Sequence, residues 1–393
     1  MKKAISTIAI ILLVISIQIP AFAVSATNYQ AEAETIASAT LNPDCNAAYL
    51  IEANTGICLY AKEQDTRQSI ASVTKIMTLL LFAEALERGA FTLSDTVRVS
   101  AYAASMGGSQ VFLKEGEEIS VEDLLKSAII ASANDASVAI AELVAGSERI
   151  FVENMNKRAA ELGLENTHFE NVTGLDDTTL EHYSSARDVA TMSRELIRHD
   201  IILKYSCIWQ DSIRGGEFTL TNTNRLIRYY DGATGLKTGS TDKAGFCISA
   251  TAKRDNMSLI AVVLGAETRD KRNEIARELL DFGFASYAVY HSEEKIVENV
   301  PVYSSKLESV PLYSESFSCL IDRSKISSVE IKYDIPEYLC APITAGQVVG
   351  GIEYYLDGEL IGKSNLYIKD DIPKLSRLDI FFMIISRAIS GKF

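Results

Sequence analysis

Long apolar stretches with helical spacing dominate the first two thirds of the sequence. The run from Ile76 to Leu86 contains no Pro or Gly and predicts a buried helix. A second helical pattern runs from Val121 to Val144, and the polar group Ser132–Asp135 interrupts it. Because polar side chains are costly to bury without partners, this group marks either a helix break with Asn134 or Asp135 as cap, or residues kept there for chemistry. Further helices are expected at 148–162, 185–198 and 273–287.

Shorter runs predict strands around these helices. The segments 47–51 and 57–60 flank Asn54-Thr55-Gly56, a pattern typical of a strand, a turn and a second strand. Further strands are expected at 219–224, 245–250 and 259–264. Helices interspersed with antiparallel strands predict an α+β domain, which we place at residues 45–290.

The C-terminal part has a different pattern. Short Val, Ile and Tyr runs separated by Gly, Pro and Asp predict a small β-rich domain at residues 291–374. In the last segment, 375–393, apolar residues recur at helical spacing among basic and polar ones. This amphipathic pattern fits a helix that lies in a membrane surface better than one that spans a membrane. A helix packed on the β-rich domain is the alternative. The recurring apolar residues are Leu378, Phe381, Phe382, Ile385 and Ile389.

The N-terminus has the pattern of a secretory signal peptide. Met1-Lys2-Lys3 is a basic start, residues 4–20 form an uncharged apolar run, and Ala21-Phe22-Ala23 offers a small-x-small cleavage site. We expect residues 1–23 to be removed, with an uncleaved membrane anchor as the alternative. Residues 24–44, rich in Ala, Ser, Thr and Glu at their start, are expected to be a disordered lead-in. The remaining chain is therefore expected outside the cytoplasm.

Charge and cysteine content narrow the possible functions. A length of 393 residues suggests two domains, and a net charge of −14 with a pI near 4.9 argues against nucleic acid as a partner. The six cysteines form no C-x-x-C pair or Cys/His cluster, so no zinc site is expected. In a secreted chain Cys319 and Cys340 could form a disulfide, or the cysteines could serve as small buried apolar residues.

The candidate nucleophile stands at the start of the first long helix. Ser72 and Lys75 are three residues apart, so their side chains lie on one helical face. A serine hydroxyl needs a nearby base, and burial beside another cation can lower the pKa of a lysine, usually about 10.4, enough to make it one. The motif alone is weak, because Ser-x-x-Lys recurs at Ser240 and Ser292, and a capping serine with a solvated lysine is the structural alternative.

Two further motifs change this assessment. The chain carries Ser72-x-x-Lys75, then Ser132-x-Asn134, then Lys237-Thr238-Gly239, and the last two patterns each occur once. This ordered triple resembles that of the penicillin-binding proteins and serine β-lactamases. Together with the loop 171–176 and the segment 182–188, it makes the chain similar, over residues 45–393, to the D-alanyl-D-alanine carboxypeptidases of peptidase family S11. The resemblance implies a β-lactamase/transpeptidase-like fold, a β-rich C-terminal domain with an amphipathic tail, and no cofactor or metal.

The resemblance also implies the role of each motif residue. Ser72 would attack the carbonyl between the last two D-alanines of a peptidoglycan stem peptide, and Lys75 would accept its proton. Ser132 would pass that proton toward the departing D-alanine, and Asn134 would hold the substrate amide and Lys75. The strand Lys237-Thr238-Gly239 would align the peptide edge to edge. β-Lactam antibiotics would be inhibitors at the same serine, and the outer face of the cell membrane would hold the tail.

Two further binding residues follow from the same resemblance. The backbone N–H groups of Ser72 and Ser240 are the expected oxyanion donors. Some family members carry His or Tyr at the position of Ser240, so side-chain effects there differ in this chain. Arg272 matches the arginine that contacts the substrate carboxylate, with an exposed helix arginine as the alternative.

Three other functions compete with hydrolysis of D-Ala-D-Ala. A class A β-lactamase needs a loop glutamate in a Glu-x-x-Leu-Asn pattern, and residues 161–166 come near this pattern with one residue too many. A non-catalytic wall sensor would not need all four chemical positions intact. A transpeptidase would differ only in the fate of the acyl-enzyme.

Overall fold

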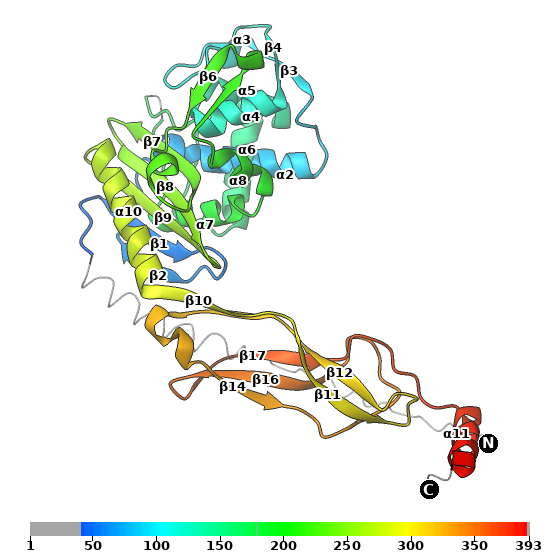
Figure 1. Cartoon of the computed structure of the whole chain (residues 1–393). Helices are drawn as coiled ribbons and strands as arrows, with labels where there is room; N and C mark the ends of the chain where they lie inside the picture. The colour runs from blue at the N-terminus through cyan, green and yellow to red at the C-terminus, as the bar shows by residue number, and fades with distance from the viewer. Residues whose placement is uncertain (1–40, 178, 391–393) are drawn as a thin grey trace, which may run out of the picture.

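The computed structural model describes residues 41–177 and 179–390 (Figure 1). A larger domain of helices around a sheet is followed by a smaller β-rich domain that carries the C-terminal helix (Figure 1). The expected signal peptide and nearly all of the expected lead-in lie outside the described residues.

A five-stranded antiparallel sheet, ordered β2-β1-β9-β8-β7, forms the centre of the larger domain. Its strands are β1 (Ala47–Glu52), β2 (Cys58–Lys62), β7 (Ala233–Thr241), β8 (Gly245–Arg254) and β9 (Met257–Ala266). Two small hairpins are added by β3 (Thr96–Arg98) with β4 (Glu118–Ser120) and by β5 (Gln210–Ile213) with β6 (Phe218–Thr221). The strand β7 lies at one edge of the main sheet.

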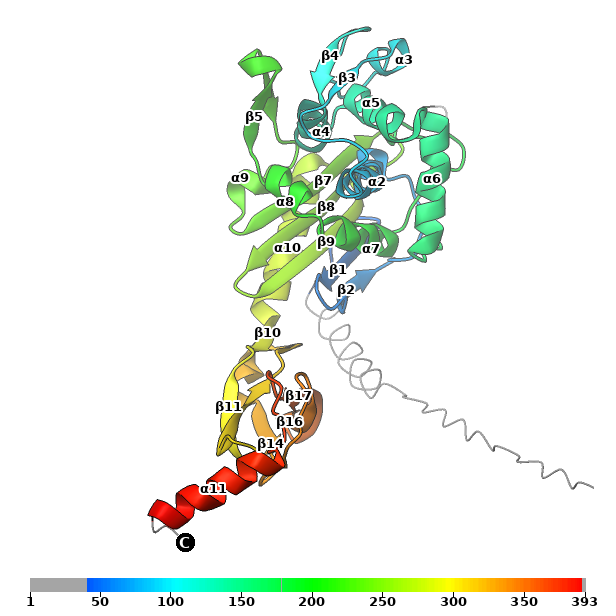
Figure 2. The same ribbon diagram turned by 90° about the vertical axis from the view of Figure 1, so that its right-hand side faces the viewer.

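Helices cover both faces of this sheet (Figure 2). Strand β9 shows why: Ile260 and Val262 pack into a core with the helices on one face, whereas Leu259 and Ala261 pack into a second core with α10 on the other. The helices are α2 (Lys75–Glu87), α3 (Ala101–Ala104), α4 (Val121–Ile130), α5 (Asn134–Ala145), α6 (Glu148–Glu161), α7 (Ala186–Leu196), α8 (Asp200–Ser206), α9 (Leu226–Tyr229) and α10 (Arg269–Ser286). These confirm the α+β prediction.

The interruption in the second helical pattern separates α4 from α5. Ala133 is the N-terminal cap position of α5, and no side chain caps it. Asn134 and Asp135 are both buried, and their side chains bond elsewhere: the Asp135 carboxylate accepts from the backbone N–H groups of Val111 and Leu113 at 3.1 and 3.0 Å. The helix break is real, but the alternative that these two residues are simply caps is wrong.

The smaller domain contains a six-stranded sheet, ordered β14-β16-β17-β12-β11-β15. It is joined to the larger domain by the paired strands β10 (Tyr287–Ser292) and β13 (Phe317–Asp322), so the expected boundary at residues 290 and 291 falls within a strand. The remaining elements are β11 (Ile296–Tyr303), β12 (Ser309–Ser314), the 3₁₀ turn η3 (Arg323–Ser328), β14 (Glu330–Asp334), β15 (Leu339–Cys340), β16 (Val348–Leu356) and β17 (Glu359–Tyr367).

All six cysteines lie within the described residues, and no disulfide joins any of them. The disulfide alternative for Cys319 and Cys340 is therefore not realised in this structure. The alternative of small buried apolar residues holds for only half of the set, namely Cys45, Cys58 and Cys247. Burial raises the pKa of Cys45 and Cys247 to about 11, which keeps these thiols protonated.

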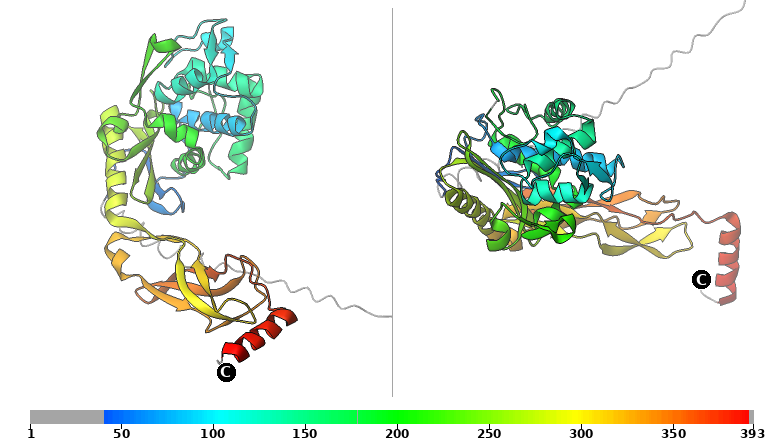
Figure 3. Two further views of the ribbon diagram at one scale, coloured as in Figure 1. Left: turned by 45° about the vertical axis from the view of Figure 1, so that its right-hand side comes forward. Right: turned by 90° about the horizontal axis from the view of Figure 1, so that it is seen from above.

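The C-terminal helix α11 (Arg377–Ser390) lies at the end of the smaller domain that is remote from the larger one (Figures 1 and 3). Its apolar side chains are exposed, and Ile380, Met383 and Ile384 extend the apolar set that the sequence predicted. Among the described helices, none combines the length and apolar character that crossing a bilayer requires.

Candidate active site

The candidate nucleophile sits in a 3₁₀ turn, η1 (Ala71–Thr74), that leads directly into α2. The Nζ atom of Lys75, the first residue of α2, lies 2.9 Å from the Oγ atom of Ser72. No side chain caps either η1 or α2, and Lys75 is completely buried. The alternative of a capping serine with a solvated lysine is therefore wrong for this pair.

Lys75 has three hydrogen-bond partners, which match the three N–H groups of a protonated amine. Besides Ser72, they are the Oδ1 atom of Asn134 at 2.6 Å and the backbone oxygen of Thr173 at 2.8 Å. The last two oxygens can only accept hydrogen bonds. When the amine is neutral, they take its two remaining N–H groups, and the nitrogen lone pair faces the hydroxyl of Ser72. The geometry suits a base.

The surroundings of Lys75 favour the neutral amine. Burial lowers the pKa of Lys75 well below its usual range, and the charge of Lys237 lowers it further, while the carboxylate of Asp135 acts in the opposite direction. Lys237 is also buried, and burial followed by the charge of Arg272 lowers its pKa to about 7. The two lysines and the arginine thus form a chain of cations, each of which weakens the proton affinity of the next.

Ser132 lies in the break between α4 and α5. Its Oγ atom accepts a hydrogen bond of 2.7 Å from Nζ of Lys237. Ser132 has a φ of 60° and Ala71, next to the nucleophile, has a φ of 47°, and each such left-handed residue other than glycine costs about 1–3 kcal/mol. Two of the eight described non-glycine residues with positive φ therefore stand at, or directly before, the serines that the motifs identify.

Strand β7 carries the third motif, Lys237-Thr238-Gly239, beside η1. We call η1, which contains Ser72, the nucleophile turn. Nζ of Lys237 also donates to the backbone oxygen of Thr238 at 2.9 Å, which anchors the lysine along its own strand. Gly239 crosses the turn so closely that a Cβ atom there would lie 2.7 Å from the backbone nitrogen of Ser72 and 2.8 Å from the backbone oxygen of Ile70. Only glycine fits this position without a shift of the backbone.

We therefore expect Gly239→Ala to slow acylation by about 10- to 100-fold, because a displaced turn misplaces the nucleophile. The rate of covalent labelling by a fluorescent penicillin measures this. Gly351→Ala, where an added Cβ would lie 3.7 Å from the Ser364 backbone oxygen, is the matched control and is expected to label at the wild-type rate. Equal rates for the two variants would show that the close approach is unimportant.

A cavity of about 150 Å³ opens over the motif residues. Of the predicted residues, Ser72, Ser132, Thr238, Gly239, Ser240 and Arg272 line it. Lys75, Asn134 and Lys237 lie beneath it, buried and hydrogen-bonded to the lining residues Ser72, Ser109 and Ser132, respectively. Arg272 is only 3% exposed, so its alternative as an exposed helix arginine is wrong.

Four features of the site were not predicted from the sequence. Arg269 lies one helical turn before Arg272 at the start of α10 and lines the same cavity, so its spacing could have suggested it. Ser109 and Thr223 also line the cavity, and the hydroxyl of Thr238 donates to that of Thr223 at 2.8 Å. The fourth is the backbone oxygen of Thr173, which no side-chain motif could reveal.

The loop that supplies this oxygen is held by Asn171. Its Oδ1 atom accepts from the backbone N–H groups of Thr173 at 3.1 Å and Gly174 at 2.7 Å, and its Nδ2 atom donates to the backbone oxygen of Leu175 at 2.7 Å. A Cβ atom on Gly174 would lie 1.9 Å from the backbone oxygen of Ala71. The loop is therefore pressed against the nucleophile turn, and glycine makes this possible.

A buried histidine ties the same loop to the turn. Burial lowers the pKa of His182 to about 4, so its ring is neutral at pH 7. Nδ1 accepts from the backbone N–H of Glu170 at 3.1 Å, which leaves the proton on Nε2, 2.8 Å from the hydroxyl of Thr74. His182 therefore donates to the residue just before Lys75.

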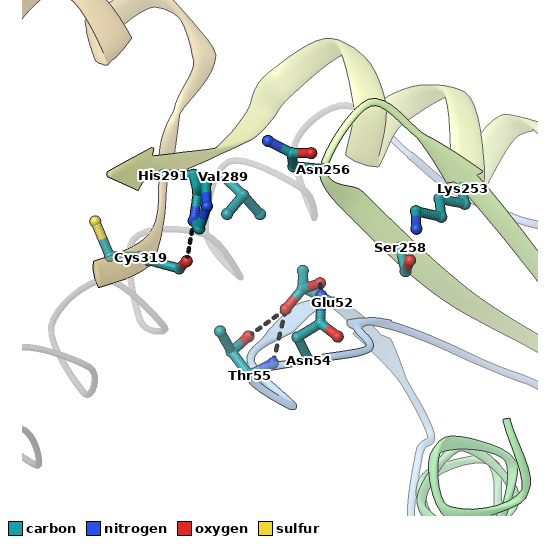
Figure 4. Close-up of a pocket in the computed structure, with 10 residues that line it drawn as sticks. Glu52, Asn54, Thr55, Lys253, Asn256, Ser258, Val289, His291 and Cys319 are labelled. Atoms are coloured by element: carbon teal, nitrogen blue, oxygen red, sulfur yellow. Dashed lines mark hydrogen bonds between the residues drawn. The ribbon is translucent and has the colours of Figure 1, made fainter. Parts of the chain in front are cut away.

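A second cavity, of about 320 Å³, lies where the two domains meet (Figure 4). It is lined from the larger domain by the turn after β1 and the β8–β9 hairpin, and from the smaller domain by β10 and β13. The buried carboxylate of Glu52 accepts from the backbone N–H and the hydroxyl of Thr55 at 2.7 and 2.8 Å, so the turn itself satisfies this charge. None of the motif residues lines this cavity.

The glutamate that a class A β-lactamase needs has no counterpart in the site. Glu161 ends α6, where it is about half exposed and its carboxylate lies 3.3 Å from Nη1 of Arg158. The partner that faces Lys75 from the 171–176 loop is instead the backbone oxygen of Thr173.

Comparison with known proteins identifies the family of the chain. A family model described as D-alanyl-D-alanine carboxypeptidase, peptidase S11, matches residues 33–268, and one described as the C-terminal domain of penicillin-binding protein 5 matches residues 284–374. The D-alanyl-D-alanine carboxypeptidase DacF of Bacillus subtilis (strain 168) is 43% identical over 95% of each chain.

Solved structures show the same likeness. Penicillin-binding protein 5 from Haemophilus influenzae is 34% identical, with a TM-score of 0.68 over 85% of this chain and 99% of that one. Penicillin-binding protein D2 from Listeria monocytogenes, in its ampicillin-bound form, is 30% identical, with a TM-score of 0.58 over 62% of this chain and 99% of that one. The chain belongs to the D-alanyl-D-alanine carboxypeptidases of peptidase family S11.

Proposed function

We propose that this chain removes the terminal D-alanine from peptidoglycan stem peptides through an acyl-enzyme formed on Ser72. The observation that carries this proposal is the contact set of Lys75, whose neutral amine directs its lone pair at the Ser72 hydroxyl. Ser72 Oγ attacks the carbonyl carbon between the last two D-alanines, and Nζ of Lys75 takes the proton. The backbone N–H groups of Ser72 and Ser240, both on the cavity lining, would hold the oxyanion.

Collapse of the tetrahedral intermediate needs a proton on the departing amine. The hydroxyl of Ser132, held by Lys237 at 2.7 Å, would pass this proton to the D-alanine nitrogen as the C–N bond breaks. Arg272, with Arg269 beside it, would meet the free carboxylate of the substrate at the cavity. Water then attacks the Ser72 ester and frees the shortened peptide.

The same serine would be the target of β-lactam antibiotics. A β-lactam presents a strained amide and a carboxylate in the arrangement of the D-Ala-D-Ala end, and the relative from Listeria monocytogenes has been crystallised with ampicillin bound. Attack by Ser72 would open the ring and leave the drug esterified to the enzyme. Penicillin would then block the peptidase reaction.

One experiment tests this function directly. The mass of the purified protein after treatment with penicillin is expected to rise by the mass of the drug, and a Lys-D-Ala-D-Ala peptide is expected to release free D-alanine. An added amine acceptor distinguishes hydrolysis from transpeptidation, because only a transpeptidase would convert most of the peptide to the amide. Absence of both the adduct and free D-alanine would refute the proposal.

We also propose that the chain is exported and held at the outer face of the cell membrane by α11. The polar side of this helix is tied to its own domain, because Asp379 Oδ1 lies 2.7 Å from Nζ of Lys306. Its apolar side chains point elsewhere: Leu378, Phe382 and Ile389 are 69%, 64% and 83% exposed. Burial of such a face in lipid is favourable by at most about 1.5–3 kcal/mol per large side chain.

We expect a chain that ends after Lys374 to stay folded and soluble and to keep its activity on a small D-Ala-D-Ala peptide. The full-length chain is expected to sediment with liposomes, and raised salt is not expected to release it, because hydrophobic burial rather than charge holds it. Sedimentation at low and high salt measures both. If truncation unfolds the smaller domain, or if the full-length chain ignores liposomes, α11 is a packing element.

A further inference from the structure

The end of the smaller domain next to α11 has an exposed apolar surface of its own. Tyr303, at the end of β11, is 58% exposed, Leu307 in the following turn is 49% exposed, and Tyr338 is 54% exposed. The rings of Tyr303 and Tyr338 meet edge to face with their centroids 5.2 Å apart. We call these three residues the tip.

The turn between Tyr303 and Leu307 is joined to α11 and to the residues just before it by two contacts. The backbone N–H of Leu375 donates to the backbone oxygen of Ser304 at 2.7 Å. Two residues further along the same turn, Lys306 pairs with Asp379 of α11. The exposed apolar side chains of the tip and those of α11 therefore belong to one end of the molecule, which Figure 3 shows to be remote from the catalytic domain.

The composition of the tip suits the boundary between lipid and water. Tyrosine rings prefer this boundary because one end is apolar and the hydroxyl stays hydrated. Lys306 lies between Tyr303 and Tyr338 in the sequence, and its side chain is 71% exposed. Its ammonium group pairs with Asp379 and has further N–H groups that can meet lipid headgroups. A net charge of −14 on the whole chain disfavours contact of the acidic body with anionic lipid, so a local apolar contact is needed to bring this end close.

We propose that Tyr303, Leu307 and Tyr338 dock on the surface of the same phospholipid bilayer that α11 enters. This proposal rests on the membrane attachment proposed above. Two contacts with lipid at one end fix the direction in which the smaller domain stands on the bilayer, whereas a helix alone would leave that direction to one backbone hydrogen bond and one exposed ion pair. The catalytic domain is then held on the side away from the lipid.

The test uses the full-length chain and its single tryptophan, Trp209, which lies in the catalytic domain. A Trp209→Phe/Tyr338→Trp variant is mixed with vesicles of phosphatidylcholine and phosphatidylglycerol whose acyl chains are brominated near the headgroup. We expect its emission to shift to the blue and to be quenched. The wild-type protein, whose tryptophan is far from the lipid, is the control and is expected to show neither change.

A matched pair of substitutions adds an affinity measurement. Leu307→Ser is expected to weaken vesicle binding by about threefold or more, since a partly inserted leucine contributes a fraction of its full transfer energy. Ile326→Ser, a similar change at a residue that is 41% exposed on η3, is expected to bind as the wild type does. η3 is held at the opposite end of the domain, where Arg323 donates to the backbone oxygen of Phe284 in α10.

The outcomes separate the two membrane proposals. If the full-length chain sediments with vesicles but the tryptophan at position 338 is not quenched, or if the two serine variants bind equally, the tip does not touch lipid and the proposal is overturned, while attachment through α11 stands. If the full-length chain does not sediment at all, both proposals fail.

Discussion

Ser72→Ala is expected to yield a folded protein that forms no covalent adduct with a fluorescent penicillin and releases no measurable D-alanine from a D-Ala-D-Ala peptide. Loss of a serine nucleophile typically costs about 10⁶-fold in turnover, far more than the loss of a binding contact. The alanine removes only the Oγ atom that Lys75 contacts, and the surrounding turn keeps its packing. Gel labelling, D-alanine release and circular dichroism measure the three parts of this prediction.

The chain offers its own control for this variant. Ser292 and Lys295 have the same spacing as Ser72 and Lys75, but Ser292 lies in β10, well outside the candidate site. Ser292→Ala is expected to be labelled as the wild type is. Full labelling of Ser72→Ala would move the nucleophile to another serine and would overturn the proposed mechanism.

The second large effect is expected from the two buried lysines, which we assign different roles. Lys75→Arg replaces the base with a guanidinium that stays protonated, so acylation is expected to fall by about 10²- to 10⁴-fold, the usual contribution of general base catalysis. Lys237→Arg keeps the positive charge near Ser132 and is expected to lose less. The rate of acylation by penicillin, followed in single-turnover experiments, measures both.

The pH dependence of acylation separates the roles further. The reaction needs unprotonated Lys75, so its rate is expected to rise with pH through the lowered pKa of Lys75. Lys237→Met removes the positive charge that helps to lower the pKa of Lys75. The part of the pH profile in which the acylation rate rises, its rising limb, is therefore expected to move to higher pH. Lys237→Arg keeps the charge and is not expected to move the limb upward. Equal acylation rates for Lys75→Arg and Lys237→Arg would show that the division of roles is wrong.

The sequence could name most of the residues that the structure brings together in the candidate site, because its signals were side chains at fixed spacings. The pair Ser72 and Lys75 and the lone Lys237-Thr238-Gly239 strand required no knowledge of which helix packs on which strand. Each motif alone is a weak indication of function, but the occurrence of all three in this order is specific. The helices also followed from pattern, since α4 and α5 begin and end within a few residues of the expected limits.

The rest of the site depends on tertiary contacts that a sequence pattern does not contain. Thr173 acts through its backbone oxygen, and any residue type would supply that atom. Arg272 could be read as exposed or buried, because an amphipathic pattern does not say how far a helix end is covered by its neighbours. The sequence alone allowed a disulfide between Cys319 and Cys340. Whether such a bond forms depends on the positions of the two thiols in three dimensions.

Strand β7 lies at the edge of its sheet, and an open edge is a hazard because it can pair with the edge of another molecule and start aggregation. Here the nucleophile turn packs against the face of the sheet at Gly239, because a strand Cβ atom points out of the plane of the sheet, and two arginines of α10 line the cavity beside the strand. The turn and the arginines enclose the space beside the edge in a cavity of about 150 Å³, which suits a short chain end with a carboxylate better than a long flat strand from a second copy of the protein. The protein can therefore keep an unpaired edge for a short peptide end without the risk of polymerising through it.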